Sequence, residues 1–194
     1  MGVIKTALEI ALERTENVNS DKSSINQFEA RQKGKKLANS FLSGDIDLVS
    51  ELKKEAETER NNIKTGIFSI LIAQITLPGA NEDMDRMKKL GKGLEAIIED
   101  RNFSAMYNQL ILLFSQYLQE ASKCEQMIRQ QYAPKLRQKE EELSRRLGRE
   151  IHIDPFQDPE FAAFYNQHMN ALKSNYEPVI DEARKETSRM FNGE

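Results

Sequence analysis

The amino-acid sequence predicts an all-α protein, an elongated bundle of about six helices, on three observations. Apolar residues recur at intervals of three and four along most of the chain, which places them on one face of a helix. The chain of 194 residues has only 9 glycines and 5 prolines, too few for the many turns of a sheet protein. Charged residues make up 30% of the chain and hydrophobic residues 39%, a balance typical of helices with broad solvent-facing surfaces. We expect one domain over residues 1–194.

The N-terminal part is predicted to contain two helices separated by a linker. Residues 1–16 form an amphipathic helix with Ile4 and Leu12 on its apolar face. The polar stretch 17–24 has no periodicity and is interpreted as the linker. A second helix follows and ends before Gly44, because glycine enters the left-handed conformation without strain.

A third helix is predicted to begin after Asp45 or Asp47, because an aspartate side chain accepts hydrogen bonds from the first amides of a helix. Its last part, Ile67–Leu77, is apolar enough to form a strand instead. We interpret it as helical because the spacing of three and four continues through it. Pro78 and Gly79 end this helix.

A fourth helix completes the bundle predicted for residues 25–102. Asn81 caps it, and it extends from Glu82 to about Glu99. Acidic residues in its first turn favour this start, because they interact with the partial positive charge of a helix N-terminus.

The C-terminal half is predicted to form a long, kinked, antiparallel helical hairpin over residues 103–192. No glycine occurs between Phe103 and Gly148, and apolar residues recur there as in a coiled coil. Pro134 removes one backbone hydrogen bond, so we expect a kink or a break. The turn lies near residues 148–158, and Asp158 caps a last helix that begins with a proline.

The sequence contains no recognisable catalytic, cofactor or metal site, and we expect no enzyme. The two histidines, His152 and His168, are not in Glu-x-x-His pairs, and no glycine-rich phosphate loop or nucleophile motif occurs. His152, Asp154 and Asp158 could in principle hold a cation, but their spacing matches no established site. A single Cys124 cannot form an intramolecular disulfide.

Charge and hydropathy predict a cytoplasmic protein that neither spans a membrane nor is attracted to nucleic acid as a whole. The first apolar stretch is interrupted by Lys5 and Glu9, unlike a secretory signal. The longest apolar run, Ile67–Leu77, is far shorter than the about 20 residues needed to cross a bilayer. The formal net charge is -3, from 31 acidic and 28 basic residues. This balance argues against nucleic acid as a general partner.

The candidate interaction surface lies near the hairpin turn, where basic residues concentrate on the end of the long helix. The glutamates at 140–142 interrupt them and can pair with them along the helix. The turn adds a histidine, an aspartate and a phenylalanine. The candidate residues are Lys135, Arg137, Lys139, Arg145, Arg146, Arg149, His152, Asp154 and Phe156.

Three functions are compatible with these patterns. The preferred hypothesis is a non-enzymatic protein–protein interaction or scaffold protein, which packs against itself or another protein's helices, because apolar stripes far outnumber chemical motifs. One alternative is a binder of nucleic acid or an anionic surface through the basic residues 135–149. The other is a small-ligand binder or enzyme at the loop 152–158.

The chain also resembles an uncharacterised family of bacterial, cytosolic, all-helical proteins with no known function. The resemblance rests on three stretches, Ile4–Thr15, Gln131–Leu143 and Asp154–Phe161. It implies a bacterial cytosolic origin and an all-helical fold. It brings no catalytic residues that could be assigned to positions in this chain.

Overall fold

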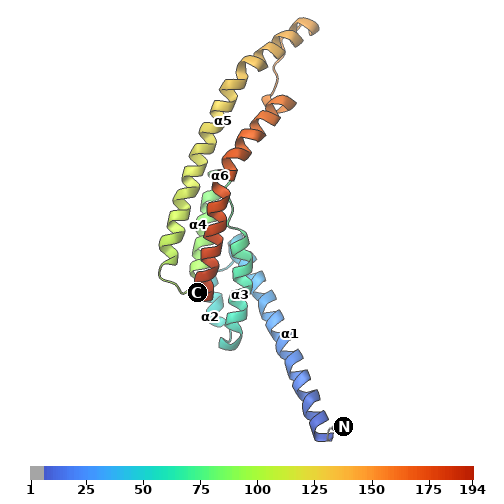
Figure 1. Ribbon diagram of the computed structural model, residues 1–194, viewed down its shortest axis with the longest axis vertical. Coiled ribbons are helices and arrows are strands. Elements are labelled where there is room, and N and C mark those ends of the chain that lie inside the picture. Colours follow the sequence, from blue (N-terminus) through green and yellow to red (C-terminus); the bar gives the residue numbers. More distant parts are fainter. Residues whose placement is uncertain (1–6) are drawn as a thin grey trace, which may run out of the picture. The chain divides into compact units, whose positions relative to one another are not determined.

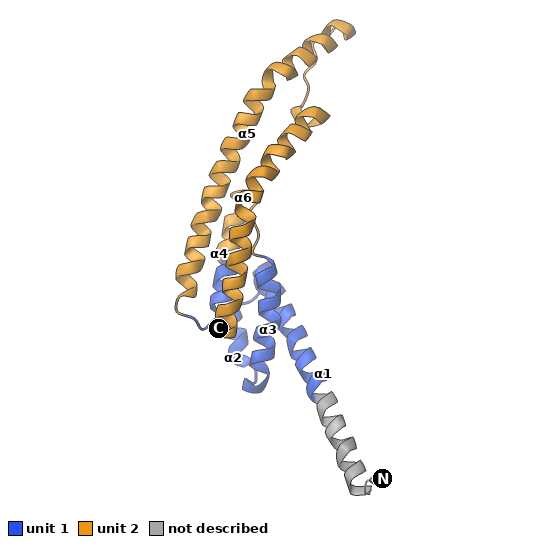
Figure 2. Cartoon of the chain, in the orientation of Figure 1, with its two compact units in different colours: residues 1–74, 89–100 blue, residues 75–88, 101–194 orange. Residues whose placement is uncertain are grey.

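The computed structural model describes the backbone of residues 7–194 and the side chains of residues 23–194 (Figure 1). Residues 7–194 contain six α-helices, one short 3-10 helix and no strand, which confirms the all-α prediction. The chain folds into two compact units (Figure 2). Unit 1 consists of residues 1–74 and 89–100, and unit 2 of residues 75–88 and 101–194. The single domain expected from the sequence stays a prediction.

Helix α1, Ala7–Ser43, is continuous, so the linker predicted at residues 17–24 is wrong. This stretch contains no glycine or proline. Its Asn, Ser and Asp residues are weak helix formers that cost less than about 0.7 kcal/mol each relative to alanine, so they do not break a helix. The first part of the predicted N-terminal helix, residues 1–6, lies outside the described residues. Gly44, with φ of 95°, ends α1 as expected.

The third predicted helix is in fact two helices, α2 (Leu48–Lys54) and α3 (Glu57–Ala73). Asp47 caps α2, accepting a hydrogen bond from the Ser50 amide at 3.0 Å. The segment Ile67–Leu77 is helical up to Ala73 and irregular beyond it, with no strand.

The break between α2 and α3 lies at Glu55 and Ala56, which both adopt extended backbone conformations. Two contacts hold Glu55 there. The Lys33 ammonium from α1 lies 2.5 Å from its carboxylate, and Arg60 Nη2 donates to its carbonyl oxygen at 3.0 Å. The break is therefore accompanied by a contact with another helix, which local sequence patterns do not reveal.

Helix α4, Asp83–Glu95, is shorter at both ends than the predicted helix. The Asp83 carboxylate accepts hydrogen bonds from the amides of Gly79 and Ala80, at 2.7 and 3.1 Å, and so organises the turn before the helix. In unit 1, Gly93 of α4 lies against the side chains of Phe41 and Leu71. Helix α3, the later part of α4 and the turn after α4 all contribute buried apolar residues to this unit: Ile63, Ile67, Leu71, Leu90, Leu94 and Ile97.

Helices α1 and α3 approach each other backbone to backbone at Gly34 and Gly66. A Cβ atom on Gly34 would lie 2.1 Å from the Ile63 carbonyl oxygen, and one on Gly66 would lie 2.1 Å from that of Arg31. Only residues without a Cβ permit this approach. The two glycines therefore set the spacing of the two helices.

Unit 2 is built on the hairpin of α5 (Phe103–Leu147) and α6 (Pro159–Asn192). Aromatic pairs show that the helices pack antiparallel: Tyr117 contacts Tyr176, with ring centroids 5.1 Å apart, and Tyr132 contacts Phe161 at 5.3 Å. The step from Tyr117 to Tyr132 equals the step back from Tyr176 to Phe161, so one register holds along this length. The predicted hairpin is present, and α5 continues through Pro134 without a break, curving along its length (Figure 1).

Two buried or half-buried side chains attach the segment 75–88 to the hairpin within unit 2. The Tyr107 hydroxyl donates to the Met87 carbonyl at 2.9 Å, and Arg184 Nε donates to the Ile75 carbonyl at 2.9 Å. Of the helices in the described part of the chain, none combines the length and apolar character needed to cross a membrane.

Candidate functional site

The candidate site is the end of the hairpin, where α5 stops and the chain turns back toward α6. Gly148, with φ of 64°, ends α5 in the left-handed conformation. The returning segment is held along the last turns of α5 by two side chains. Ser144 Oγ accepts a hydrogen bond from the Ile151 amide, and Glu140 Oε1 accepts one from the Ile153 amide, both at 2.9 Å. The turn is thus fixed by polar residues of α5.

The start of α6 is attached to α5 by a cluster of charged side chains around Asp158. Asp158 is 5% exposed and caps α6, accepting a hydrogen bond from the Glu160 amide at 3.0 Å. The Lys139 ammonium from α5 lies 2.8 Å from Asp158 Oδ2 and 2.6 Å from Glu160 Oε2. The Tyr132 hydroxyl donates to Asp158 Oδ2 at 3.0 Å. We call these four residues the hairpin clamp.

The contacts within the hairpin clamp shift the pKa values of its charged side chains. Hydrogen bonds from Lys139 and then Lys135 lower the pKa of Glu160 to about 2. The hydrogen bond from Lys139 is also the largest cause of the lowered pKa of Asp158, and it outweighs the effect of burial. The same bond to Asp158 is the main reason why the pKa of Lys139 is raised. All three groups are therefore charged at neutral pH.

Next to the clamp, α5 and α6 meet in an apolar cluster. Ile128, Tyr132 and Phe161 are buried there, and five partly buried side chains pack around them: Cys124, Leu136, Phe164, Tyr165 and Met169. The pairs of Tyr132 with Phe161 and of Phe156 with Phe161 are edge-to-face, a favourable aromatic geometry. This cluster and the clamp together fix the register of the hairpin.

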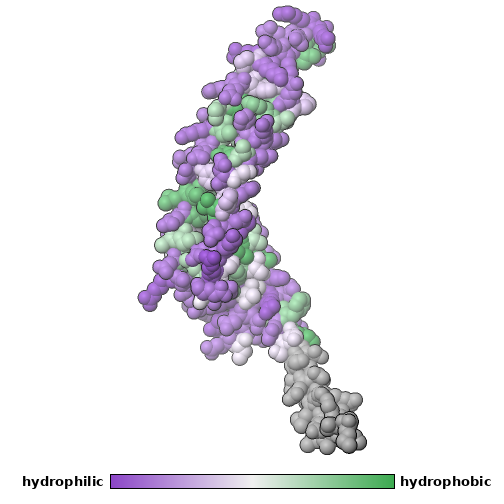
Figure 3. All heavy atoms as spheres, viewed as in Figure 1, coloured by the Kyte–Doolittle hydropathy of each residue, from purple (hydrophilic) through white to green (hydrophobic). Residues whose placement is uncertain are grey.

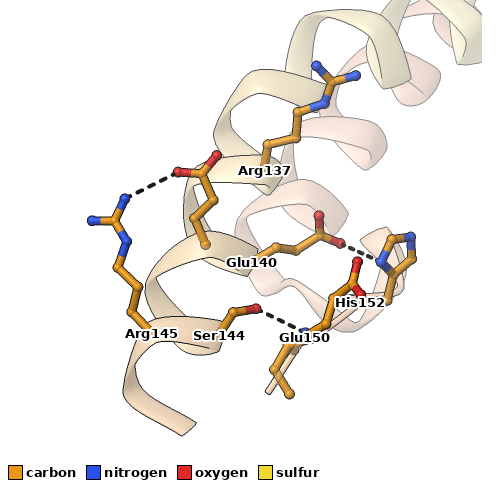
Figure 4. A pocket seen from close by; sticks show the side chains of 8 residues that line it. Arg137, Glu140, Ser144, Arg145, Glu150 and His152 are labelled. Carbon is orange, nitrogen blue, oxygen red and sulfur yellow. Dashed lines mark hydrogen bonds and ion pairs between the residues drawn. The ribbon is translucent and has the colours of Figure 1, made fainter. Parts of the chain in front are cut away.

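The predicted basic cluster divides into residues with different surroundings. Lys135 and Lys139 contact Glu160, so both are engaged in holding the hairpin. Arg137 and Arg145 line an open cavity of about 390 Å³ beyond the clamp. Its other lining residues come from α5 and the returning segment (Figure 4): Glu140, Glu141, Ser144, Glu150, Ile151 and His152.

The charges around this cavity are mixed rather than basic. Arg145 Nη2 lies 3.8 Å from the Glu141 carboxylate, and His152 Nδ1 lies 4.0 Å from Glu140 Oε1 (Figure 4). The imidazole of His152 is 90% exposed. Arg146 and Arg149 are exposed and are not among the lining residues. The hairpin end therefore presents both signs of charge to the solvent.

The other two predicted site residues support the turn. Asp154 accepts a hydrogen bond from the Phe156 amide at 3.0 Å and caps the 3-10 helix η1 (Pro155–Gln157). Phe156 is 48% exposed, contacts Tyr165 edge-to-face at 5.2 Å, and lies under the Arg129 guanidinium at 5.3 Å. Within residues 23–194, no three or more His, Cys, Asp or Glu side chains gather as a metal site would require.

Sequence reasoning recognised Asp158 as a helix cap but missed its pairing with Lys139. One signal was available. Tyr132 and Lys139 are two helical turns apart, so they lie on the same face of α5. The partners Asp158 and Glu160 follow the turn, and only the hairpin register brings them to this face.

The fold and the site define an all-helical protein built around an antiparallel hairpin with a charged, partly apolar end. A family model described as a family of unknown function (DUF6657) matches residues 49–189. The chain belongs to this family, which confirms the resemblance to an uncharacterised family. No curated protein and no solved structure matches the chain.

Proposed function

We propose that the protein is a non-enzymatic interaction protein that binds a helix of a protein partner at the end of the α5–α6 hairpin. One observation carries this proposal: α5 extends beyond the start of α6 and exposes an apolar side chain there. Leu147, in the last turn of α5, is 57% exposed.

The register of the hairpin explains why this side chain is uncovered. Tyr132 already lies opposite Phe161, near the first residue of α6. The turns of α5 after Lys139 therefore have the returning segment beside them and no facing helix. Long helices obtain most of their stability from packing an apolar face, so an exposed Leu147 at such an end favours a partner helix.

The surroundings favour a protein partner over nucleic acid. Figure 3 shows a hydrophilic surface over most of the hairpin end, with a small hydrophobic patch among the hydrophilic residues. Lys135 and Lys139 contact Glu160 and Asp158, and Arg145 lies 3.8 Å from the Glu141 carboxylate. Arg137, Arg146 and Arg149 are also exposed, but the glutamates at 140–142 and 150 lie among them, and such mixed charge attracts a phosphate backbone less than a purely basic surface would. A mixed-charge rim around apolar residues is instead typical of protein interfaces.

A matched pair of variants tests the proposal on the full-length protein. Leu147→Glu places a charge at the hairpin end, and Leu112→Glu places the same charge at another exposed leucine of α5, which is 70% exposed. We expect Leu147→Glu to abolish binding, measured first as self-association by sedimentation equilibrium and then as cross-linking to a partner in lysate. Leu112→Glu should retain it.

Two outcomes would contradict the proposal. If neither variant differs from the wild-type chain in either measurement, the hairpin end is not the binding surface. If binding disappears after nuclease treatment and falls steeply with salt, the partner is nucleic acid and the basic residues 135–149 provide the contact.

A further inference from the structure

A small cavity in unit 1 has the charge and composition of an anion-binding site. Its volume is about 170 Å³, below the range of about 300–1,000 Å³ typical of drug-sized ligands. Helices α2 and α3 and the turn after α4 provide the lining residues: Val49, Leu52, Lys53, Arg60, Lys64 and Ala96. Three of these six residues are cationic, and none of the six is acidic.

The cations are held close together by the secondary structure. Arg60 and Lys64 are four residues apart on α3, so they lie on the same face. Like charges at this spacing destabilise a helix by about 0.2–0.5 kcal/mol. Lys53, in the last turn of α2, adds a third positive charge. The apolar side chains of Val49 and Leu52 keep part of the lining free of competing polar groups, which strengthens electrostatic attraction.

Arg60 has hydrogen-bonding capacity that the described residues leave unused. Its Nη2 donates to the Glu55 carbonyl, whereas its buried Nε has no acceptor among the described residues. A buried donor without a partner costs about 1–3 kcal/mol, and more when it is charged. Arg60 also lines the cavity, so an oxygen ligand bound there would be a candidate acceptor for its guanidinium.

Lys64 already binds an oxyanion of the chain itself. Its ammonium lies 2.7 Å from Glu99 Oε1. The Lys64 side chain is only 17% exposed, whereas the Glu99 side chain is 84% exposed. A pair of this kind, with one solvent-exposed partner, contributes little stability and can be exchanged. A free oxyanion can therefore replace the Glu99 carboxylate at Lys64.

We propose that this cavity binds a small oxyanion, a phosphate or a carboxylate, between Lys53, Arg60 and Lys64. The ligand would accept hydrogen bonds from the guanidinium of Arg60 and the two ammonium groups. Charge-assisted hydrogen bonds of this type are stronger than neutral ones. This site is independent of the hairpin end.

Isothermal titration calorimetry of the full-length protein with inorganic phosphate, at ionic strength held constant with chloride, tests the proposal. We expect saturable binding with one site. Arg60→Gln and Lys53→Gln should each weaken it by at least about tenfold, because each removes a charged donor. Glu99→Gln should tighten it, because it removes the competing carboxylate. Repeating the titration with acetate and a short dicarboxylate identifies which oxyanion binds more tightly.

Lys54→Gln is the matched control. Lys54 is in the same turn of α2 and pairs with Glu51 at 2.6 Å, but it is not a lining residue. Lys54→Gln should leave the affinity for phosphate unchanged. The proposal is overturned if no oxyanion gives saturable binding at millimolar concentration, or if Lys54→Gln weakens binding as much as Lys53→Gln does. Circular dichroism of Lys53→Gln and Glu99→Gln establishes that these surface variants remain folded.

Discussion

The Lys139 ammonium on α5 lies 2.8 Å from the carboxylate of Asp158, which caps α6. Asp158 thus has two roles at one position: it accepts the hydrogen bond that starts α6, and it attaches that start to α5. Few residues could replace it. Serine and asparagine would cap the helix, but they would not carry the charge that pairs with Lys139.

Asp158→Asn and Asp158→Ala should separate these two roles. The asparagine keeps the cap and loses the charge, whereas the alanine loses both. We expect Asp158→Ala to lower the free energy of unfolding by about 1 kcal/mol more than Asp158→Asn does, which is the typical contribution of a cap. Equilibrium unfolding in urea measures both variants. Equal effects would show that the cap contributes nothing here.

Removing the basic partner should destabilise the hairpin because it leaves Asp158 buried beside fewer donors. We expect Lys139→Met to lower the urea midpoint clearly. Lys135→Met should lower it less, because Glu160, the carboxylate that pairs with Lys135, has a side chain that is 57% exposed. The two substitutions remove the same charge from the same helix. If their effects are equal, the buried position of Asp158 does not matter.

The clamp also predicts how stability depends on pH. The pKa of Glu160 is lowered to about 2, from an ordinary value of 4.5, chiefly by the hydrogen bond from Lys139. The pKa of Asp158 is lowered from 3.8, again chiefly by Lys139. Between these ordinary values and the lowered ones, the unfolded chain binds more protons than the folded chain, so stability falls as the pH falls.

Urea midpoints measured from pH 7 down to about pH 2 test this dependence. The stabilisation should be fully present above about pH 5 and lost progressively below it. In Lys139→Met, the pKa values of both carboxyl groups should move back toward their ordinary values, so the decline should be shallower. A decline as steep as that of the wild type would contradict the assignment to Lys139.

The glycine contact between α1 and α3 predicts an unusual effect of alanine. In most helix positions, glycine to alanine stabilises by about 0.5–1 kcal/mol. At Gly34 and Gly66, the new Cβ would meet a backbone oxygen, so Gly34→Ala and Gly66→Ala should instead destabilise by about 1–3 kcal/mol. Gly79→Ala, in the turn before α4, is the control for the steric contact alone, because the atom nearest to its new Cβ is a side-chain oxygen of Asp83 at 3.4 Å. Thermal unfolding distinguishes the three.

At Pro134, by contrast, we expect substitution by alanine to stabilise the protein. It is exposed within a continuous helix, and proline lacks the amide that would bond one turn back. Pro134→Ala should therefore raise the free energy of unfolding, by up to about 3 kcal/mol. Pro178→Ala, at an exposed proline within α6, shows whether replacing any helical proline of this protein raises the free energy of unfolding. A loss of stability in Pro134→Ala alone would mean that the curvature of α5 is needed for packing on α6.

The sequence allowed the hairpin to be predicted well because its limits are set by strong local signals. Gly148 takes the left-handed conformation that ends α5, and an aspartate followed by a proline starts α6. The break after α2 was missed because no glycine or proline marks it, and Glu55 there contacts Lys33 of another helix. Such a contact leaves no trace in the spacing of apolar residues.

The candidate site was predicted only in part for the same reason. A run of basic residues on α5 was evident, but the sequence did not show which of them face α6. Lys135 and Lys139 turn out to hold Glu160, whereas Arg137 and Arg145 line the cavity. The distinction depends on the hairpin register. The cavity proposed to bind an anion has no sequence motif, because its three cations come from two different helices.

The order of the two units along the chain has a consequence for how the protein is synthesised. Unit 1 includes residues 89–100, and Leu90, Leu94 and Ile97 are buried in its core. A ribosome that has released only residues 1–74 has therefore exposed α1 and α3 without the side chains that cover them. Unit 1 can complete its core only after Asp100 has emerged from the ribosome. By then residues 75–88, the first segment of unit 2, have emerged as well. A fragment cut after Ala73 should accordingly aggregate rather than fold.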